Sequence, residues 1–304
     1  MEKLMTKADA GFAPTALNGY RACPLRFYYS EIAGLKESEE IKDEIDPQSL
    51  GKAVHDALKN LYSPSTGQAL SPDTVQMMIE RIDQETEKAF QKIFKGESIG
   101  FGKNLLLVQV AKIMIRRFIR NELEFVQELA VNGENIRMIM LEKPLMKTVT
   151  ISCNGSPLKV KLKGFVDRID KVGDMTRVID YKTGKAEQKE LQVKDWEELI
   201  TNHNLDKGFQ LLMYAYLLAN PKHPAFISAG IISLRRPSAG MIEVTVPGDN
   251  TNKKVSILET ATLTMMEEIL TRLLQDIYNP AIPFQQTTDP DRCSRCPYIP
   301  ICGR

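Results

Sequence analysis

Apolar residues recur at helical spacing through much of the first half of the chain. Asp46-Pro47 and Ser71-Pro72 each place a capping side chain directly before a proline, a composition typical of a helix start. In the long segment "KNLLLVQVAKIMIRRF", apolar residues recur at helical spacing. The helices expected from these signals cover residues 14–33, 48–62, 72–94 and 103–131, with a charged, solvated loop over 36–46.

The second half begins with a different pattern. Lysines alternate with Val160 and Leu162, which is the period of two that a strand requires. Gly173-Asp174 supplies a turn, so the strand after it is expected to form a hairpin with the strand before it. The expected strands cover 137–145, 157–170, 176–183 and 225–236, and further helices cover 207–220 and 254–277. This order predicts an α/β or mixed α+β fold with a mixed sheet flanked by helices.

Composition narrows the classes of protein to consider. With 304 residues, of which 43% are hydrophobic, the chain can bury one large core or two modest ones. The net charge of +1 excludes a generally basic surface, so any nucleic-acid contact must come from local clusters of cations. No stretch approaches the roughly 20 apolar residues of a membrane span, and the N-terminus has no signal-peptide core. We therefore expect a cytoplasmic protein with no membrane partner.

Acidic residues in the expected hairpin form a candidate metal site. Asp167 and Asp180 lie thirteen residues apart on neighbouring strands, so their carboxylates can reach one divalent ion. Magnesium prefers such hard oxygen ligands. Lys182 shares a strand face with Asp180 and can orient water or offset the charge of a phosphate. An Asp-x-Lys triplet is also a common surface salt bridge, so the pair does not decide the matter alone.

Three further side chains could join this site. His55, on an early helix, could add an imidazole ligand or contact a phosphate. Gln210 and Tyr214 are four residues apart on one helical face and can both donate hydrogen bonds. Each has an ordinary alternative, as a satisfied helix histidine or as the polar edge of an amphipathic helix.

The order of these pieces resembles a known family. "GKAVHDAL", "GFVDRID", "VIDYKTGK" and "QLLMYAYLL" are similar to the ordered motifs of RecB/AddB-type nucleases, in the PD-(D/E)xK superfamily with its restriction-endonuclease-like fold. The resemblance runs from about residue 12 to the C-terminus. It implies metal binding by His55, Asp167 and Asp180, catalysis with Lys182, and positioning by Gln210 and Tyr214. Glu142 matches a family acid that we expect to support the ligands rather than to bind metal.

Four of the five cysteines form a second candidate metal site. Cys293, Cys296 and Cys302 are closely spaced in the tail, and Cys23 is the candidate fourth thiolate. The residues alone allow zinc or a [4Fe–4S] cluster. The arrangement of one cysteine before the nuclease core and three after it resembles the iron–sulfur staple of AddB-type nucleases, which implies a [4Fe–4S] cluster here. Cys153 lies in a turn between strands and is expected to be a free thiol.

These expectations combine into one function. We expect a single nuclease domain over 1–304, made of a helical part (12–132), a catalytic core (133–279) and a cysteine-rich tail (280–304). The resemblance implies a Mg²⁺- or Mn²⁺-dependent DNA exonuclease in double-strand-break repair or recombination, with a helicase or helicase domain as a candidate partner. The alternatives are a catalytically silent DNA-end-binding module and a zinc-stapled protein-interaction domain.

Cations that could contact a DNA backbone are scattered along the sequence. Each is as readily explained by a solvated helix or strand face, although a nuclease must hold a polyanion. The candidates are Arg116, Arg117, Arg120, Lys161, Lys163, Arg235 and Arg236.

Overall fold

Helices make up the N-terminal part of the chain and cover the sheet that follows. The computed structural model describes residues 2–36, 46–94, 99–153, 155–220, 226–248, 251–294 and 296–303. The α-helices in these ranges are α1 (Glu2–Ala10), α2 (Pro14–Ala22), α3 (Pro24–Phe27), α4 (Pro47–Tyr62), α5 (Pro72–Ile93), α6 (Gly102–Val131), α7 (Glu198–Thr201), α8 (Asp206–Leu218), α9 (Thr260–Tyr278) and α10 (Ile299–Cys302).

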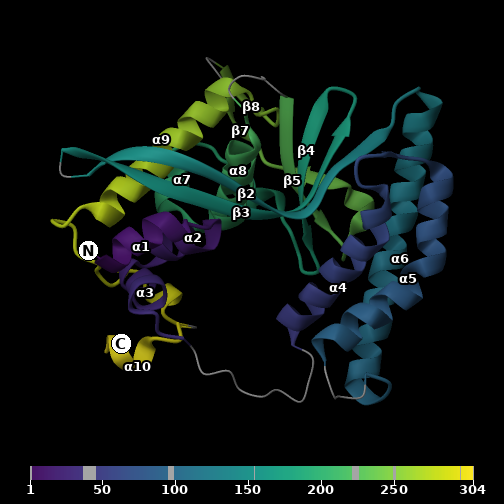
Figure 1. Ribbon diagram of the computed structural model, residues 1–304, viewed down its shortest axis with the longest axis horizontal. Coiled ribbons are helices and arrows are strands. Elements are labelled where there is room, and N and C mark those ends of the chain that lie inside the picture. Colours follow the sequence, from purple (N-terminus) through teal and green to yellow (C-terminus); the bar gives the residue numbers. More distant parts are fainter. Residues whose placement is uncertain are drawn as a thin grey trace.

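A six-stranded sheet forms the centre of the molecule (Figure 1). The strands are β1 (Ala69–Leu70), β2 (Ile136–Cys153), β3 (Ser156–Val172), β4 (Met175–Lys182), β5 (Phe226–Ser233) and β6 (Met241–Glu243), with a separate pair, β7 (Val246–Gly248) and β8 (Thr251–Val255). The order in the sheet is β1-β2-β3-β4-β5-β6. Among the described strands of this sheet, only the β4–β5 pair is parallel, with α8 in the crossover, so the predicted mixed α+β fold is confirmed.

The predicted helix starts are present as capped turns. Asp46 Oδ1 accepts a hydrogen bond from the Ser49 amide at 2.7 Å, and Ser71 Oγ accepts one from the Thr74 amide at 3.1 Å. Each cap satisfies one of the amide groups that the first turn of a helix leaves without a partner. The caps fix where α4 and α5 begin, and α4 carries His55.

Some predicted boundaries were wrong. The helix expected over 254–277 begins at Thr260, because Lys254 and Val255 pair with β7 as the end of strand β8 and Leu258 forms a bridge to Ile227 of β5. The helix expected over 14–33 is interrupted at Cys23, whose backbone is extended with φ −162°, and it ends in a π-helical turn over Tyr28–Ala33. Strands β2 and β3 extend beyond their predicted ends and pair as far as Cys153 and Ser156. The predicted charged loop falls on residues 37–45, outside the described residues.

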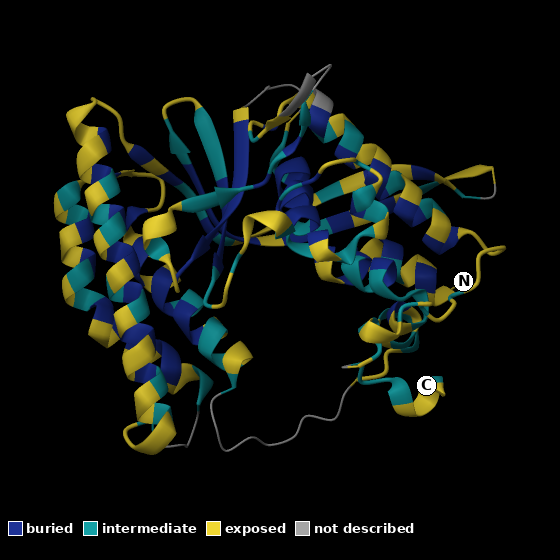
Figure 2. Ribbon diagram, turned by 180° about the vertical axis from the view of Figure 1, so that it is seen from behind, coloured by how far each residue is buried: buried dark blue, intermediate teal, exposed yellow. Residues whose placement is uncertain are grey.

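Strand β4 lies between two hydrophobic cores (Figure 2). Val178 packs into the core formed with α8 and α9, whereas Ile179 and Tyr181 pack into the core formed with α4, α5 and α6. Successive side chains of a strand point to opposite faces, so burial on both faces fixes the register of β4. Asp180 and Lys182 are thereby held at a defined place at the end of a rigid strand.

The two ends of the chain lie on the same side of the molecule. Figure 1 places α3 next to the C-terminal α10. The Leu25 amide donates to the Gln285 carbonyl at 3.0 Å, and Phe27 and Phe284 pack with ring centroids 5.8 Å apart. Among the described residues, no helix is long and apolar enough to cross a bilayer.

Candidate active site

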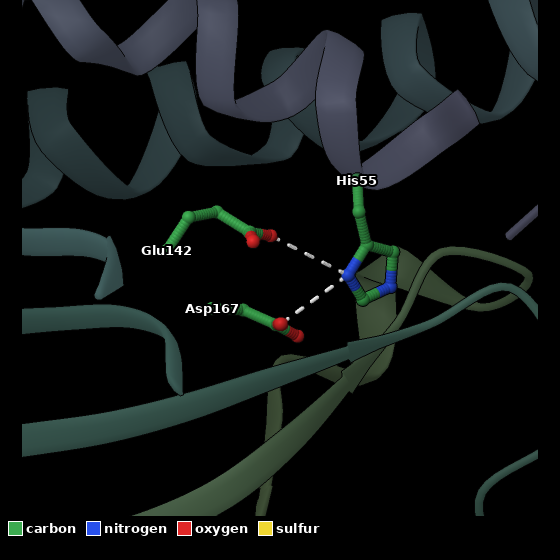
Figure 3. A group of neighbouring side chains, drawn as sticks. All are labelled: His55, Glu142 and Asp167. Atoms are coloured by element: carbon green, nitrogen blue, oxygen red, sulfur yellow. Dashed lines mark ion pairs between the residues drawn. The ribbon is translucent and has the colours of Figure 1, made fainter. Parts of the chain in front are cut away.

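His55 faces two carboxylates from the sheet. Its Nδ1 atom lies 3.2 Å from Asp167 Oδ1 and 3.8 Å from Glu142 Oε1 (Figure 3). The edge of the imidazole ring meets the Tyr181 ring, with centroids 6.2 Å apart and planes at 90°. The histidine therefore projects from α4 onto the sheet at the place where the two carboxylates converge.

Glu142 reaches this point through an unusual backbone conformation. Its φ is +46°, the one positive φ recorded for a non-glycine residue in the described chain. A glutamate pays a conformational cost for this geometry, and such outliers concentrate at functional sites. The flanking pairs Leu141–Arg168 and Lys143–Val166 place Glu142 opposite Asp167 in the β2–β3 ladder. We infer that the positive φ directs the Glu142 side chain towards Asp167 on the neighbouring strand β3.

The structure groups Glu142 with His55 and Asp167, whereas the resemblance gave it only a supporting role. One ligand atom from each of His55, Glu142 and Asp167 lies within 4.8 Å of the others, so Glu142 belongs to the group that could hold a metal ion. The sequence marked Glu142 only through its match to a family acid. The signal that could have placed it was its position opposite Asp167, which required the register of β2 and β3.

Asp180 and Lys182 lie beside this group. Lys182 Nζ is 2.7 Å from Asp180 Oδ2, which confirms the predicted contact on one strand face. The Tyr181 amide between them donates to Asp167 Oδ2 at 2.7 Å. That hydrogen bond leaves Oδ1 of Asp167 facing His55. The end of β4 therefore both presents its own acid and orients the acid of the neighbouring strand.

Helix α8 adds the glutamine and tyrosine. Gln210 Nε2 lies 3.4 Å from Asp180 Oδ1 and donates to the Tyr214 hydroxyl at 2.7 Å. Tyr214 packs against Gly164 of β3, where an added Cβ would lie 2.7 Å from the tyrosine ring. The glycine of "GFVDRID" therefore permits the close approach of α8 to the sheet.

The charged groups of the site shift one another's pKa values. Burial alone would lower the pKa of His55, but its hydrogen bonds to Asp167 and Glu142 raise the pKa to about 10. Burial, together with the negative charge of Asp167, raises the pKa of Asp180 to about 6 despite the nearby Lys182. The carboxylates thus concentrate enough negative potential to hold a proton on an imidazole, and a divalent cation would relieve the same repulsion.

A family model described as the PD-(D/E)XK nuclease superfamily matches residues 11–303. The chain belongs to the PD-(D/E)XK nuclease superfamily. A search of curated proteins found no match. Matching solved structures include one titled "Crystal structure of SSO0001", with 13% identity over 94% of each chain and a TM-score of 0.26, too low to inform the site.

Membership in the PD-(D/E)XK superfamily gives the site a chemical meaning. It indicates a nuclease that depends on a divalent metal. The acids and lysine that fit the superfamily pattern are Asp167, Asp180 and Lys182. The donor set of one imidazole and hard carboxylate oxygens fits Mg²⁺ or Mn²⁺, and His55, Glu142 and Asp167 would hold the ion with Asp180 beside them.

The four predicted cysteine ligands gather at a second place. Cys23, Cys293, Cys296 and Cys302 all line one pocket between the end of α2 and the C-terminal tail, although Cys23 lies 270 residues before Cys293. Within the described chain, no three cysteine sulfur atoms lie within 4.8 Å of one another. Cys153 lies elsewhere, with its Sγ 3.7 Å from the Tyr278 carbonyl oxygen.

Glu142→Gln is expected to weaken Mn²⁺ binding by at least about 10- to 100-fold, the loss typical of a residue that only supports a metal ligand, because the site loses one carboxylate charge while the side chain keeps its shape. Calorimetric titration with Mn²⁺ measures this change. Glu134→Gln, on the exposed turn before β2, is the matched control and should leave the affinity unchanged. Equal affinity in the wild type and the Glu142 variant would remove this residue from the metal site.

Gly164→Ala is expected to lower nuclease activity by about tenfold, because the new methyl group must displace the Tyr214 ring and with it the Gln210 contact to Asp180. The measurement is the rate of DNA cleavage beside a thermal unfolding curve. Gly184→Ala is a control, since nothing lies within 4 Å of a Cβ added there. Full activity in the Gly164 variant would show that the close approach is not needed.

Proposed function

We propose that this protein is a Mg²⁺- or Mn²⁺-dependent DNA exonuclease of the RecB/AddB type, acting in double-strand-break repair or recombination. One observation carries the proposal: His55, Glu142 and Asp167 converge from three elements, next to the Asp180–Lys182 pair. The order of the motifs along the sequence supports the RecB/AddB subtype. A helicase or helicase domain remains the partner that this resemblance favours, in the cytoplasm.

The residues of the site divide the work of phosphodiester hydrolysis. The reaction forms a bond from a water oxygen to phosphorus and breaks the bond from phosphorus to the leaving sugar oxygen. A bound divalent ion supplies the Lewis acid that activates the water and offsets phosphate charge. Lys182 Nζ, now 2.7 Å from Asp180, can donate to the water or to a non-bridging oxygen. Gln210 contacts both Asp180 and Tyr214, and so keeps their side chains at a fixed position relative to Lys182.

Fewer cations are available to contact DNA than the sequence suggested, because several candidates contact other residues of the protein. Arg116 pairs with Asp83 at 2.6 Å, and Lys163 Nζ donates to the Ala10 carbonyl at 2.9 Å. Lys161 lies 3.9 Å from Asp9. Arg235 and Arg236 follow β5, whose residue Ser233 is the register partner of Lys182. We therefore favour these two arginines as contacts to the DNA backbone near the site.

We also propose that the four pocket cysteines hold a [4Fe–4S] cluster. In a tetrahedral zinc site, Zn–S bonds of about 2.3 Å keep the sulfur atoms roughly 3.8 Å apart. No three sulfur atoms lie that close together in the described chain, so their distances favour neither metal, and the proposal of iron rests on the resemblance of the cysteine arrangement to the AddB-type staple. Anaerobic purification followed by iron, sulfide and zinc analysis tests this part, and stoichiometric zinc without iron would contradict it.

The decisive experiment for the function is cleavage of end-labelled DNA by the purified protein. Single-stranded and double-stranded substrates are compared with Mg²⁺, Mn²⁺ or EDTA. We expect metal-dependent release of short products from an end, and a circular substrate distinguishes exonuclease from endonuclease action. Binding of DNA ends without cleavage under every metal condition would favour the alternative, a catalytically silent end-binding module.

A further inference from the structure

Two arginines next to the pocket cysteines reach the start of the helix that serves the active site. Arg21 comes two residues before Cys23, and Arg292 comes directly before Cys293. Both guanidinium groups contact the segment that leads into α8, from Asn202 to Asp206. Polar contacts therefore join the cysteine pocket to the start of α8.

Arg21 is the buried member of this set. Its side chain is 1% exposed, and it donates to Asp206 Oδ1 at 2.9 Å and to the Asn202 carbonyl at 2.8 Å. Its guanidinium also lies 4.6 Å from the centre of the Phe209 ring. A buried guanidinium must keep its partners, so the first turn of α8 cannot shift without breaking these contacts.

Arg292 ties the tail to the same place. It donates through Nη1 to the carbonyl oxygens of Arg21 at 3.0 Å and Ala22 at 2.7 Å, and its Nη2 lies 2.5 Å from His203 Nδ1. His203 begins the 3₁₀ turn His203–Leu205 that leads directly into α8. Arg292 also lines the cysteine pocket itself. Its planar fork thus touches the pocket, the end of α2 and the approach to α8 at once.

The catalytic end of α8 lies within two turns of these contacts. Gln210 is one turn beyond Asp206, and Tyr214 is two turns beyond it. Their hydrogen bonds to Asp180 and to each other need α8 at a fixed position along the sheet. A small movement at the start of the helix therefore reaches both side chains.

We propose that Arg21 and Arg292 are positioning residues that couple the cysteine-lined pocket to the active site through the first turn of α8. A metal group bound in the pocket fixes Cys23 and Cys293, and with them the neighbouring Arg21 and Arg292. Through the first turn of α8, the two arginines then fix the positions of Gln210 and Tyr214. The proposal rests on the proposed function, because it treats the pocket as a metal site and α8 as part of a nuclease. By linkage, order in α8 and occupancy of the pocket support each other.

Hydrogen exchange of the α8 amides tests the coupling by a double-mutant cycle in the full chain. Cys296→Ser removes a pocket ligand and Arg292→Gln removes the link. Each alone is expected to speed exchange at 206–214 by roughly tenfold, and the double variant should exchange no faster than either one. Arg272→Gln, which breaks an exposed ion pair with Glu197 on the surface, is the matched control and should change nothing in α8.

Further measurements separate this coupling from general loss of structure. Exchange at the central strands β3 and β5 should stay at the wild-type rate in Arg292→Gln, and its pocket metal content should stay near the wild-type value. Arg292→Lys keeps the charge but loses the fork, so it should restore only part of the protection. In steady-state cleavage, Arg292→Gln should lower kcat by about tenfold with little change in KM for DNA.

Several outcomes would overturn the coupling. One is wild-type exchange at α8 in Arg292→Gln, and another is multiplication of the two single effects in the double variant. Unchanged exchange in Cys296→Ser would also do so, because the pocket would then exert no hold on α8. A protein that cleaves no DNA yet shows the non-additive cycle would contradict the proposed function and leave the coupling supported.

Discussion

Asp180→Asn and Lys182→Met are each expected to lower the rate of DNA cleavage by about a thousandfold at saturating Mg²⁺. Asp180 is 5% exposed, and its carboxylate is shared between Lys182 and Gln210. The amide variant removes the charge that holds Lys182 at 2.7 Å and the charge available to a metal. The methionine variant removes the ammonium group that lies 2.7 Å from Asp180.

The same hairpin supplies a matched control. Lys171 and Asp174 form an exposed ion pair at 3.7 Å beside the turn between β3 and β4. Asp174→Asn and Lys171→Met repeat both chemical changes at the end of the hairpin remote from the site, and both should cleave DNA at the wild-type rate. Single-turnover cleavage with end-labelled DNA measures the rates. Wild-type cleavage by either active-site variant would end the assignment of Asp180 and Lys182.

The local elements could be predicted from the sequence because their signals are local. Asp46 and Ser71 are read as caps without knowledge of the rest of the chain, and both cap helices here. The alternation of Asp180 and Lys182 with Tyr181 gives the strand and its shared face in three residues. The expected contact between Asp180 and Lys182 followed from that alternation alone, and it is present.

Features that depend on pairing between distant residues could not be predicted in the same way. Glu142 joins the candidate metal group because of its positive φ and its position opposite Asp167. Neither feature can be recognised from the residues next to it in the sequence. The two-residue strand β1 exists only because β2 offers it an edge. The last two residues of strand β8, Lys254 and Val255, were assigned to the predicted helix because their pairing with β7 was not visible in their own sequence.

The motif "GFVDRID" illustrates how a local pattern can hide a long-range function. The predicted metal site uses only the first aspartate of this motif, Asp167. In the structure, Arg168 is fully buried and contacts residues of α4, α6, β3 and β4. The motif therefore contains a residue of the candidate metal site and, in the next position, the charge that joins the helical layer to the sheet.

Arg168→Met is expected to destabilise the fold by about 3–5 kcal/mol. The guanidinium pairs with Glu122 and with Asp170, each at 2.6 Å, and donates to the Tyr181 hydroxyl at 3.2 Å. Without it, the carboxylate of Glu122, which is 6% exposed, loses its pairing with Arg168, and Asp170 keeps only its ion pair with Arg177. Chemical denaturation gives the free energy of unfolding for comparison with the wild type.

A second variant separates lost charge balance from lost packing. Arg168→Met combined with Glu122→Leu replaces the pair by apolar groups, so it should recover part of the stability that the single change loses. Arg116→Met, at an exposed ion pair on the same helix α6, should cost less than about 1 kcal/mol. A single variant as stable as the wild type would mean that the buried charges are not coupled as their distances indicate.

The pH dependence of stability should reveal the same network through Asp170. Burial would raise the pKa of this carboxyl, but the Arg168 and Arg177 guanidinium groups lower it below the ordinary value. Because the folded pKa is the lower one, the network stabilises the fold above the unfolded pKa of about 4, and this contribution is lost as the pH falls through the folded pKa. We expect Asp170→Asn to be less stable than the wild type at pH 7 and to lose less further stability between about pH 4 and pH 2. Parallel curves for the two proteins in acid would exclude Asp170 as the titrating group, since removing its carboxyl must remove its share of the slope.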